Sequence, residues 1–428
     1  MATTQRKEGP PVYSKIVSPD WHESPQEKAM KRLLGQGQIP DLIKLGAGAP
    51  ARESFPILII ESIQREILEN PSILNYGSDA GYKPLLEVLP SFFARENRKV
   101  EIGNHLENIA ITAGSQEALF ILGMIYLFKP GSKVAVASPT YIGALDAFSP
   151  FNPNYIEIKT DKDGIIPEEL EKTLDGNRDN DGNCDIKFLY EVLTFKNPDG
   201  KTTPLYRRKE IADILKKYGV LGVEDDPYSE LRYKGETIQS LQSLAPDNVI
   251  HLFTFSKTLA PDFRIGGAVA PKEIIKKIID MKKRMGLYTS SQDQAVVATY
   301  LERGHLEQHL PKILQIYKPR RDAMFEAVKK YFPEVFECSL PEGGLFLWPH
   351  LKEDAMEYKS AFNMEKIMDE AEKLGVGFLY GAPFFANSTG NEPAMRLNFS
   401  NQSEENIERG IQIIGELLHR KLETALVQ

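Results

Sequence analysis

The stretch NVIHLFTFSKTLAPDFRIGGAVA, residues 248–270, contains two apolar runs on either side of a polar turn. The first run, 248–256, predicts a strand that is buried on both faces, and the second, 266–270, predicts a shorter one. The turn begins with Ser256 and Lys257 and holds Arg264. A lysine directly after a buried strand raises the question of what neighbouring strands carry at the same end.

Similar apolar runs precede this stretch and alternate with segments of helical periodicity. The predicted strands lie at 108–112, 133–138, 186–193 and 218–224, and the helical segments lie at 116–127, 167–174 and 205–217. This alternation is typical of a doubly wound, mostly parallel sheet with helices on both faces. We therefore predict an α/β fold for this part of the chain.

The pattern changes after about residue 300. Long helices are expected at 308–331, 363–374 and 404–426, with short strands at 344–348 and 395–400 between them. Such a mixture predicts a smaller α+β domain beside the large sheet.

Composition narrows the class of protein. The 428 residues are 42% hydrophobic and 26% charged, which is ordinary for a globular chain with a substantial core. The 52 basic residues against 60 acidic ones give a net charge of -8, which argues against a general nucleic-acid binder. Two distant cysteines suggest no disulfide framework, and we see neither a signal peptide nor an apolar run that could span a bilayer. The expected location is the cytoplasm.

Ligands of open α/β sheets bind outside the carboxyl ends of the parallel strands, so residues that follow each strand are candidates for a site. Five strands are followed by polar or aromatic residues: Ser115 and Gln116; Tyr141; Asn197; Asp225 and Tyr228; and Ser256, Lys257 and Arg264. Each has an ordinary explanation alone, such as a helix cap, a core aromatic or a turn residue. Their occurrence at five strand ends favours a shared site.

The chemistry of these residues fits one cofactor. Burial and a nearby Arg264 favour the neutral amine of Lys257, the form that makes a Schiff base. A helix N-terminus at Ser115 and Gln116 suits a phosphate dianion, and Arg264 suits it too. The hydroxyls of Thr254 and Ser256 can complete that phosphate site.

The remaining candidates suit an aromatic ring. Asp225 can pair with a protonated ring nitrogen, and Tyr141 can stack on the ring face. Asn197 and Tyr228 can donate hydrogen bonds to a phenolate oxygen. Together these groups indicate pyridoxal 5'-phosphate.

The segment TFSKTLAPDFRIGG, 254–267, resembles the lysine motif of the PLP-dependent fold type I, class I/II aminotransferases. Further motifs match in the same order: LGAGAP (45–50), LNYGSDAGYKPL (74–85), ITAGSQEAL (111–119), SPTY (138–141), NPDG (197–200), EDDPY (224–228), PEGGLFLW (341–348) and MRLNFS (395–400). The resemblance covers nearly the whole chain and is greatest to the subgroup of 2-aminoadipate, kynurenine and aromatic amino acid aminotransferases.

The resemblance implies a fold and a division of the chain. The large domain, 51–300, would hold a mostly parallel seven-stranded sheet and the cofactor, and the small domain would span 301–428. The N-terminal segment, 1–50, would pack on the small domain and the site.

The resemblance also implies a role for each candidate. Lys257 would form the Schiff base and move the substrate α-proton, and Asp225 would keep the pyridine nitrogen protonated. Tyr228 and Asn197 would contact the 3-hydroxyl, and Tyr141 would stack on the ring. The phosphate would be held by Ser115, Gln116, Thr254, Ser256 and Arg264.

Substrate contacts and assembly follow from the same resemblance. Arg396 would clamp the α-carboxylate with two parallel hydrogen bonds, with Gly48 and Asn197 beside it. Tyr76 resembles the tyrosine that reaches the phosphate of the other subunit, which implies a homodimer with shared sites.

The expected reaction is ping-pong transfer of an amino group from an L-amino acid to a 2-oxo acid such as 2-oxoglutarate. The donor would carry an aromatic, aminoadipate-like or other long side chain. Elimination, replacement or carbon–carbon bond formation on the same fold is the alternative. One departure from the family bears on this choice, because Asp199 occupies a position where the family usually has Thr. A turn tolerates Asp well, so the replacement is either neutral or adds a carboxylate that changes which substrate charge the enzyme prefers.

Other functions find less support. The Gly-Lys-Thr at 200–202 lacks the earlier glycine of a P-loop, because that position is Phe195. His305 and His309 lack the adjacent glutamate of a zincin, and we interpret them as a pair on a helix surface. No helix-turn-helix is recognisable before the large domain, so a transcriptional role is not expected.

Overall fold

The computed structural model describes residues 24–95, 100 and 105–426. Its centre is a seven-stranded sheet in the order β2-β10-β9-β8-β7-β3-β4. The strands are β2 (Ile109–Thr112), β3 (Lys133–Ala137), β4 (Asn154–Ile158), β7 (Ile186–Glu191), β8 (Leu221–Asp226), β9 (Val249–Thr254) and β10 (Gly266–Val269). β10 is antiparallel to both β2 and β9, whereas the pairs formed by β3, β4, β7, β8 and β9 are parallel. The prediction of a mostly parallel seven-stranded sheet is confirmed.

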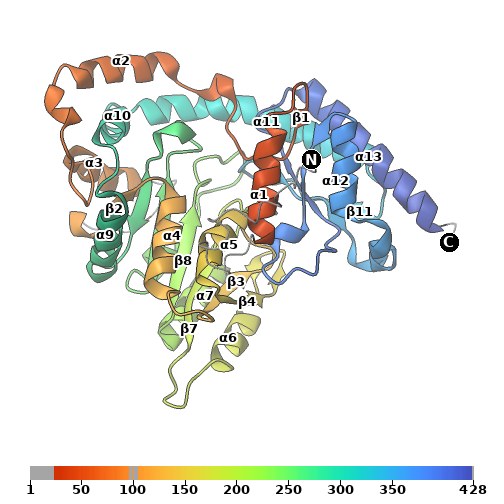
Figure 1. Ribbon diagram of the computed structural model, residues 1–428, viewed down its shortest axis with the longest axis horizontal. Coiled ribbons are helices and arrows are strands. Elements are labelled where there is room, and N and C mark those ends of the chain that lie inside the picture. The colour runs from red at the N-terminus through yellow and green to blue at the C-terminus, as the bar shows by residue number, and fades with distance from the viewer. Residues whose placement is uncertain (1–23, 96–99, 101–104, 427–428) are drawn as a thin grey trace, which may run out of the picture.

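Helices cover both faces of this sheet (Figure 1). They are α3 (Lys83–Phe93), α4 (Ser115–Tyr126), α5 (Ile142–Phe148), α6 (Pro167–Asp175), α7 (Leu205–Tyr218), α8 (Leu241–Leu244), α9 (Lys272–Gly286) and α10 (Ser291–Glu302), whereas α2 (Ile57–Leu68) packs on α10. The apolar residues of α6, α7 and α8 form a core with one set of alternate strand residues, and α4 and α5 pack on the other set. This two-sided burial explains why the strands are apolar throughout.

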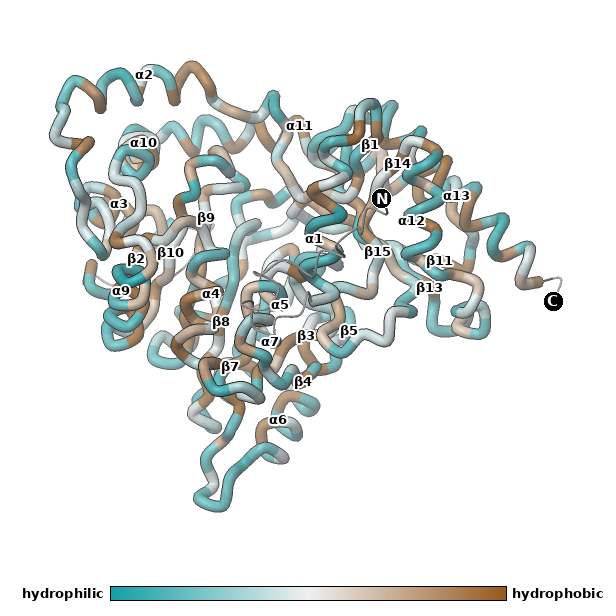
Figure 2. Tube along the Cα trace, viewed as in Figure 1, coloured by the Kyte–Doolittle hydropathy of each residue, from teal (hydrophilic) through white to brown (hydrophobic). Residues whose placement is uncertain are grey.

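Hydropathy along the chain follows this layering only in part. The tube in Figure 2 is mixed along the central strands, where β8 ends in three acidic residues, and largely brown along α4. α2 is an exception, because only Ile63 of its twelve residues is buried although the helix is rich in isoleucine. The exposed apolar face of α2 has no partner within the described part of the chain.

The smaller α+β domain lies to the right in Figure 1, beyond the long α11. Its helices are α11 (His305–Tyr331), α12 (Met364–Lys373) and α13 (Glu404–Leu426), and its strands include β11 (Phe336–Glu337), β12 (Phe346–Leu347), β13 (His350–Leu351), β15 (Leu379–Tyr380) and β16 (Met395–Asn398). β16 pairs with both β12 and β15, antiparallel in each case. The strands expected at 344–348 and 395–400 are therefore present but shorter.

The N-terminal elements connect the two domains. α1 (Pro25–Gln36) contacts α5 of the large domain, and its Arg32 pairs with Asp369 and Glu372 of α12. β1 (Ile43–Lys44) then pairs with β14 (Val376–Gly377). The chain continues from there to Gly48, close to the carboxyl ends of the large-domain strands. The remaining strands, β5 (Thr160–Asp161) and β6 (Gly164–Ile165), form a separate hairpin.

Two local expectations differ from the structure. The sequence predicts that β8 ends at residue 224, but the strand continues to Asp226, because Asp225 and Asp226 pair with Leu252 and Phe253 of β9. The interpretation of His305 and His309 as a surface pair is wrong for His309, which is 6% exposed and packs against the ring of Tyr300. Helical spacing alone does not show which side of α11 faces the core.

Candidate active site

Lys257 follows β9 and is partly buried. Its Nζ donates a hydrogen bond to the carbonyl oxygen of Gly48 at 2.8 Å. Burial, together with the positive charges of Arg396 and Arg264, lowers the pKa of Lys257 to about 8. The pKa of Lys257 is therefore close enough to neutral pH for part of the amine to be uncharged, and the uncharged amine can act as a nucleophile or a base.

Asp225 lies in β8, and both its carboxylate oxygens are inside the protein. Oδ2 accepts a hydrogen bond from the hydroxyl of Tyr190 at 3.0 Å, whereas the buried Oδ1 has no partner among the described residues. Burial raises the pKa of Asp225 to about 7, with Asp226 adding to that shift. An unsatisfied buried acceptor of this kind suits a cationic N–H donor.

A cradle for an anion lies at the N-terminus of α4. Gly114, with φ +78, precedes the helix, and a Cβ on it would lie 2.5 Å from the guanidinium of Arg264. Arg264 donates to Ser256 Oγ at 3.2 Å and to the carbonyl oxygen of Ala113 at 2.9 Å, and Thr254 Oγ1 lies 2.9 Å from Ser256 Oγ. No side chain caps the first turn of α4, so its N–H groups and Arg264 can bind one phosphate.

Gln116 and Tyr141 connect this cradle to α5. Gln116 Nε2 donates to the carbonyl oxygen of Gly143 at 2.7 Å, and Tyr141 is the residue before α5. Burial raises the pKa of Tyr141 to about 12, so its ring stays a neutral phenol. The negative charge of Asp225 adds to that shift, which reports that the two side chains are close.

Asn197, Tyr228 and Arg396 form a buried hydrogen-bonded chain. Asn197 Nδ2 donates to Tyr228 Oη at 3.3 Å, and Asn197 Oδ1 accepts from Arg396 at 2.9 Å. The other terminal nitrogen of Arg396 donates to the carbonyl oxygen of Gly46 at 2.8 Å, and its Nε has no partner among the described residues. Burial lowers the pKa of Arg396 to about 10, which still leaves a cation for a carboxylate at neutral pH.

The predicted site residues therefore come together within one chain, with one exception. Tyr76 is 86% exposed and contacts the ring of Tyr288, with ring centroids 6.0 Å apart. Within the part of the chain that the structure describes, its ring contact is with Tyr288 and no hydrogen bond or ring contact links it to the other candidates. Its place on the outer surface is the one expected of a residue that serves another copy of the chain.

Three residues of this site were not predicted from the sequence. Tyr190 supplies the only described hydrogen bond to Asp225 and lies inside an apolar strand. The ring of Phe346 lies under the guanidinium of Arg396 at 4.4 Å and leaves no room for a Cβ at Gly48. Gly46 contributes only its carbonyl oxygen. A buried tyrosine, a phenylalanine and a backbone atom carry no motif, so strand pairing was needed to find them.

The donors and acceptors fit pyridoxal phosphate. Asp225 Oδ1, which has no partner among the described residues, can accept a hydrogen bond from a protonated ring nitrogen. The cradle at Gly114 can bind the phosphate, and the amine of Lys257, with its lowered pKa, can react with the aldehyde. When bound, this cofactor withdraws electrons from the α-carbon of an attached amino acid. Fold and site together define a PLP-dependent transferase of fold type I.

Comparison with known proteins supports a PLP-dependent transferase and identifies its family. Residues 40–414 match the family "Aminotransferase class I and II". The chain is 35% identical to aromatic-amino-acid aminotransferase 1 of Thermococcus litoralis, over 96% of this chain and 98% of that one. It is 31% identical to 2-aminoadipate transaminase of Thermus thermophilus, over 92% and 94% of the two chains. This chain belongs to the class I and II aminotransferases.

A solved structure supports the same assignment. The kynurenine aminotransferase of Pyrococcus horikoshii, solved with PMP, superposes with a TM-score of 0.87 and is 35% identical. The alignment covers 96% of this chain and 98% of that one. The prediction of an aminotransferase that uses pyridoxal phosphate is confirmed.

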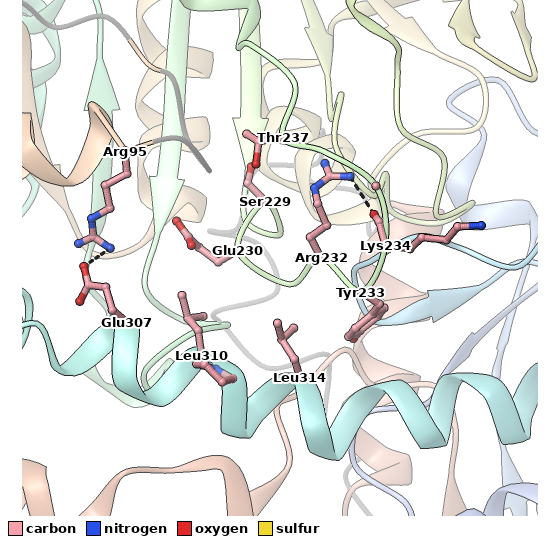
Figure 3. Close-up of a pocket in the computed structure, with 12 residues that line it drawn as sticks. Arg95, Ser229, Glu230, Arg232, Tyr233, Lys234, Thr237, Glu307, Leu310 and Leu314 are labelled. Carbon is pink, nitrogen blue, oxygen red and sulfur yellow. Dashed lines mark hydrogen bonds and ion pairs between the residues drawn. The ribbon is translucent and has the colours of Figure 1, made fainter.

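Other features of the described residues do not add a second site of this kind. A cavity of about 430 Å³ lies between α11 and the segment after β8 (Figure 3). Leu310 and Leu314 point into it from α11, and Arg95 at its edge pairs with Glu307. Within the described ranges, no three His, Cys, Asp or Glu side chains are grouped to hold a metal ion, and no helix is long and apolar enough to cross a bilayer.

Proposed function

We propose that this enzyme transfers the amino group of an L-amino acid to a 2-oxo acid such as 2-oxoglutarate by a ping-pong mechanism. The donor carries an aromatic, aminoadipate-like or other long side chain, as the names of the similar aminotransferases suggest. The observation that carries the proposal is the buried Asp225 Oδ1, which has no partner among the described residues, in one site with the Lys257 amine and the buried Arg396.

Each residue of the chain then has a defined task. Lys257 Nζ would hold the cofactor, and its amine would take the proton from the substrate α-carbon. Asp225 keeps the ring nitrogen protonated through Oδ1. Arg396 binds the α-carboxylate with two nitrogens, and Asn197 and Tyr228 hold the ring oxygen. Tyr141 would lie against the ring and exclude water from that face.

The test is a single half-reaction. Purified holoenzyme is mixed with one amino acid at a time, without an oxo acid, and the cofactor absorbance is followed. We expect conversion to the amine form by aromatic or long acidic donors, with the matching oxo acid released. Release of ammonia or of a side-chain leaving group would instead establish the elimination or replacement alternative.

Lys257→Ala is the matched variant for this test. It should abolish turnover and the absorbance of the lysine-bound cofactor. Lys282→Met provides the control, because Lys282 is also a buried lysine, at 1% exposed, but donates to a backbone carbonyl of β2. If Lys257→Ala retained full activity, the proposal would be wrong.

The proposal includes a homodimer with shared active sites. Tyr76 is 86% exposed, and apolar residues of the same part of the chain are exposed as well: Leu74 is 66% exposed, and Ile57 and Leu58 at the start of α2 are 64% and 80% exposed. Apolar exposure of this kind is typical of a surface that another subunit covers. Tyr76 would then reach the phosphate of the partner's cofactor.

Subunit mixing tests this sharing. If each site combines Lys257 of one subunit with Tyr76 of the other, hybrids of Lys257→Ala and Tyr76→Ala subunits regain one intact site. Random mixing in equal amounts should restore about one quarter of wild-type sites. No recovery, with hybrids formed, would place Tyr76 outside the site.

The remaining parts of the proposal concern organisation. We divide the chain into an N-terminal segment to residue 50, a large domain to 300 and a small domain from 301, supported by the start of α11 at His305. A cytoplasmic location is in keeping with Cys184 and Cys338, which are not bonded to each other.

A further inference from the structure

Three charged side chains are buried beneath the turn that presents Asn197. Glu191, Lys196 and Asp199 have side chains that are only 3–4% exposed. Lys196 Nζ lies 3.5 Å from Asp199 Oδ2 and 3.9 Å from Glu191 Oε1. Buried charges are costly unless they are paired, so these three depend on one another.

The backbone couples this cluster to Asn197. The N–H of Lys196 donates to the carbonyl oxygen of Lys201 at 2.8 Å, and the N–H of Gly200 donates to the carbonyl oxygen of Lys196 at 2.7 Å. These two bonds close the turn on both sides of Asn197. A shift of Lys196 or Asp199 is therefore transmitted to the Asn197 amide.

The cluster faces away from the cofactor side of the sheet. Glu191 is in register with Glu224, whereas the preceding residue, Tyr190, reaches Asp225 on the opposite face. Side chains alternate along a strand, so Glu191 lies behind the site. Asp199, which pairs with Lys196 and with Lys201 at 3.7 Å, is held there too. The aspartate thus completes a buried ion pair and is not a free carboxylate for the substrate.

Charge balance in the cluster depends on Glu191. The groups that face its carboxylate are Lys196, Asp199, Lys201 and the N–H of Val192, which donates to Oε1 at 3.1 Å. Burial raises the pKa of Glu191 to about 7, and Asp199 also raises it, whereas the two lysines act against the shift. Above that pH, the ammonium group of Lys196 is attracted to two carboxylates, that of Glu191 in β7 and that of Asp199. Below it, Asp199 alone attracts Lys196.

We propose that Lys196, Asp199 and Glu191 are positioning residues that hold Asn197 against the cofactor, and that proton binding at Glu191 loosens the turn. The inference rests on the contact proposed above between Asn197 and the ring oxygen. It adds a pH response that arises outside the groups touching cofactor or substrate.

Glu191→Gln is the decisive variant, because it keeps the shape of the side chain and removes the titration. In the wild-type holoenzyme, kcat/KM should fall about fivefold as the pH drops through the Glu191 transition. The wild-type cofactor absorbance should change over the same pH range. Glu191→Gln should have the low kcat/KM of the acidic wild-type enzyme at every pH, and its cofactor absorbance should not change over that range. Profiles that superimpose on wild type would overturn the proposal.

Lys196→Met tests the ion pair itself. We expect kcat/KM to fall about tenfold, and the added Glu191→Gln change to restore part of the loss because one unpaired carboxylate is removed. Lys282→Met is the matched buried-lysine control and should lower stability without changing the pH profile. Loss of stability alone in Lys196→Met, with unchanged kcat/KM and spectrum, would overturn the positioning role. If Lys196→Met does not fold, Glu191→Gln still decides.

Asn197→Ala separates this inference from the proposed function. It should shift the cofactor absorbance and remove the effect of Glu191→Gln. If Asn197→Ala leaves the spectrum unchanged, the Asn197 contact and the positioning cluster are both wrong. The amino-acid half-reaction and the Lys257→Ala result stand independently of that outcome.

Discussion

Two adjacent carboxylates lie on opposite faces of β8 and have different surroundings. Glu224 and Asp225 are consecutive and are 3% and 2% exposed. Glu224 faces β9 residue His251 and α7, and Asp225 faces Tyr190 and the site. The two side chains are almost equally buried, so burial does not explain why their hydrogen bonding differs.

Glu224 is fully satisfied. Its oxygens accept hydrogen bonds from the N–H groups of Leu241 and Gln242, both at 3.0 Å, and it lies 3.6 Å from Arg208. Burial acts to raise the pKa of Glu224, but the hydrogen bond and charge of His251, followed by Arg208, hold it below the usual value. Glu224 is a structural carboxylate.

Asp225 has one hydrogen bond and one open oxygen, and burial raises its pKa to about 7. The contrast teaches that a binding carboxylate is recognised by what its surroundings leave unsatisfied.

The largest effect is expected from Asp225→Asn. A neutral amide cannot keep the ring nitrogen protonated, so kcat/KM should fall on the order of a thousandfold. Thermal stability of the apoprotein should be retained, because an unsatisfied buried charge has been removed. Steady-state kinetics and thermal unfolding measure the two effects, and a large loss of stability would assign Asp225 a structural role.

The pH dependence of apoprotein stability should be smaller but clear. The native pKa of Asp225 is about 7, above its ordinary value of 3.8, so the native state binds a proton that the unfolded chain has lost. Stability should therefore decline as pH rises from about 4 to about 7, by at most a few kcal/mol. Asp225→Asn should flatten that decline in denaturant titrations, and adding cofactor should oppose it. An identical slope in the variant would contradict the prediction.

Glu224→Gln should lower the free energy of unfolding by about 2 kcal/mol, since charged hydrogen bonds are weakened. Its kcat/KM should stay close to wild type because Glu224 faces away from the site. Urea unfolding and steady-state kinetics are the measurements. A catalytic defect as large as that of Asp225→Asn would remove the distinction between the two faces.

Tyr190→Phe should have the smallest effect. It removes the hydroxyl that donates to Asp225 Oδ2 and adds no bulk, so kcat/KM should fall about fivefold. Asp225 should also become a weaker acid in the apoprotein, because a hydrogen bond to its charged form is lost. Tyr155→Phe is the matched control, since its hydroxyl donates to the carbonyl oxygen of Leu145. Equal effects of both variants would contradict a specific role for Tyr190.

Much of the fold could be predicted from the sequence. The alternation of apolar runs and helical segments predicted the parallel sheet, because strand burial is encoded in local hydropathy. The order of motifs from Ser115 to Arg396 predicted the residues that the structure brings together. Boundaries were less accurate, as at β8, where partners distant in sequence extend the strand through two acidic residues.

The motifs of the sequence were enough to predict the class of enzyme, because their order resembles that of the class I/II aminotransferases. The folded chain was needed to find Tyr190 as the partner of Asp225 and to place Asp199 in a buried ion pair with Lys196. The physical reason is strand register. Successive side chains point to opposite faces, so the surroundings of each depend on partners far along the chain.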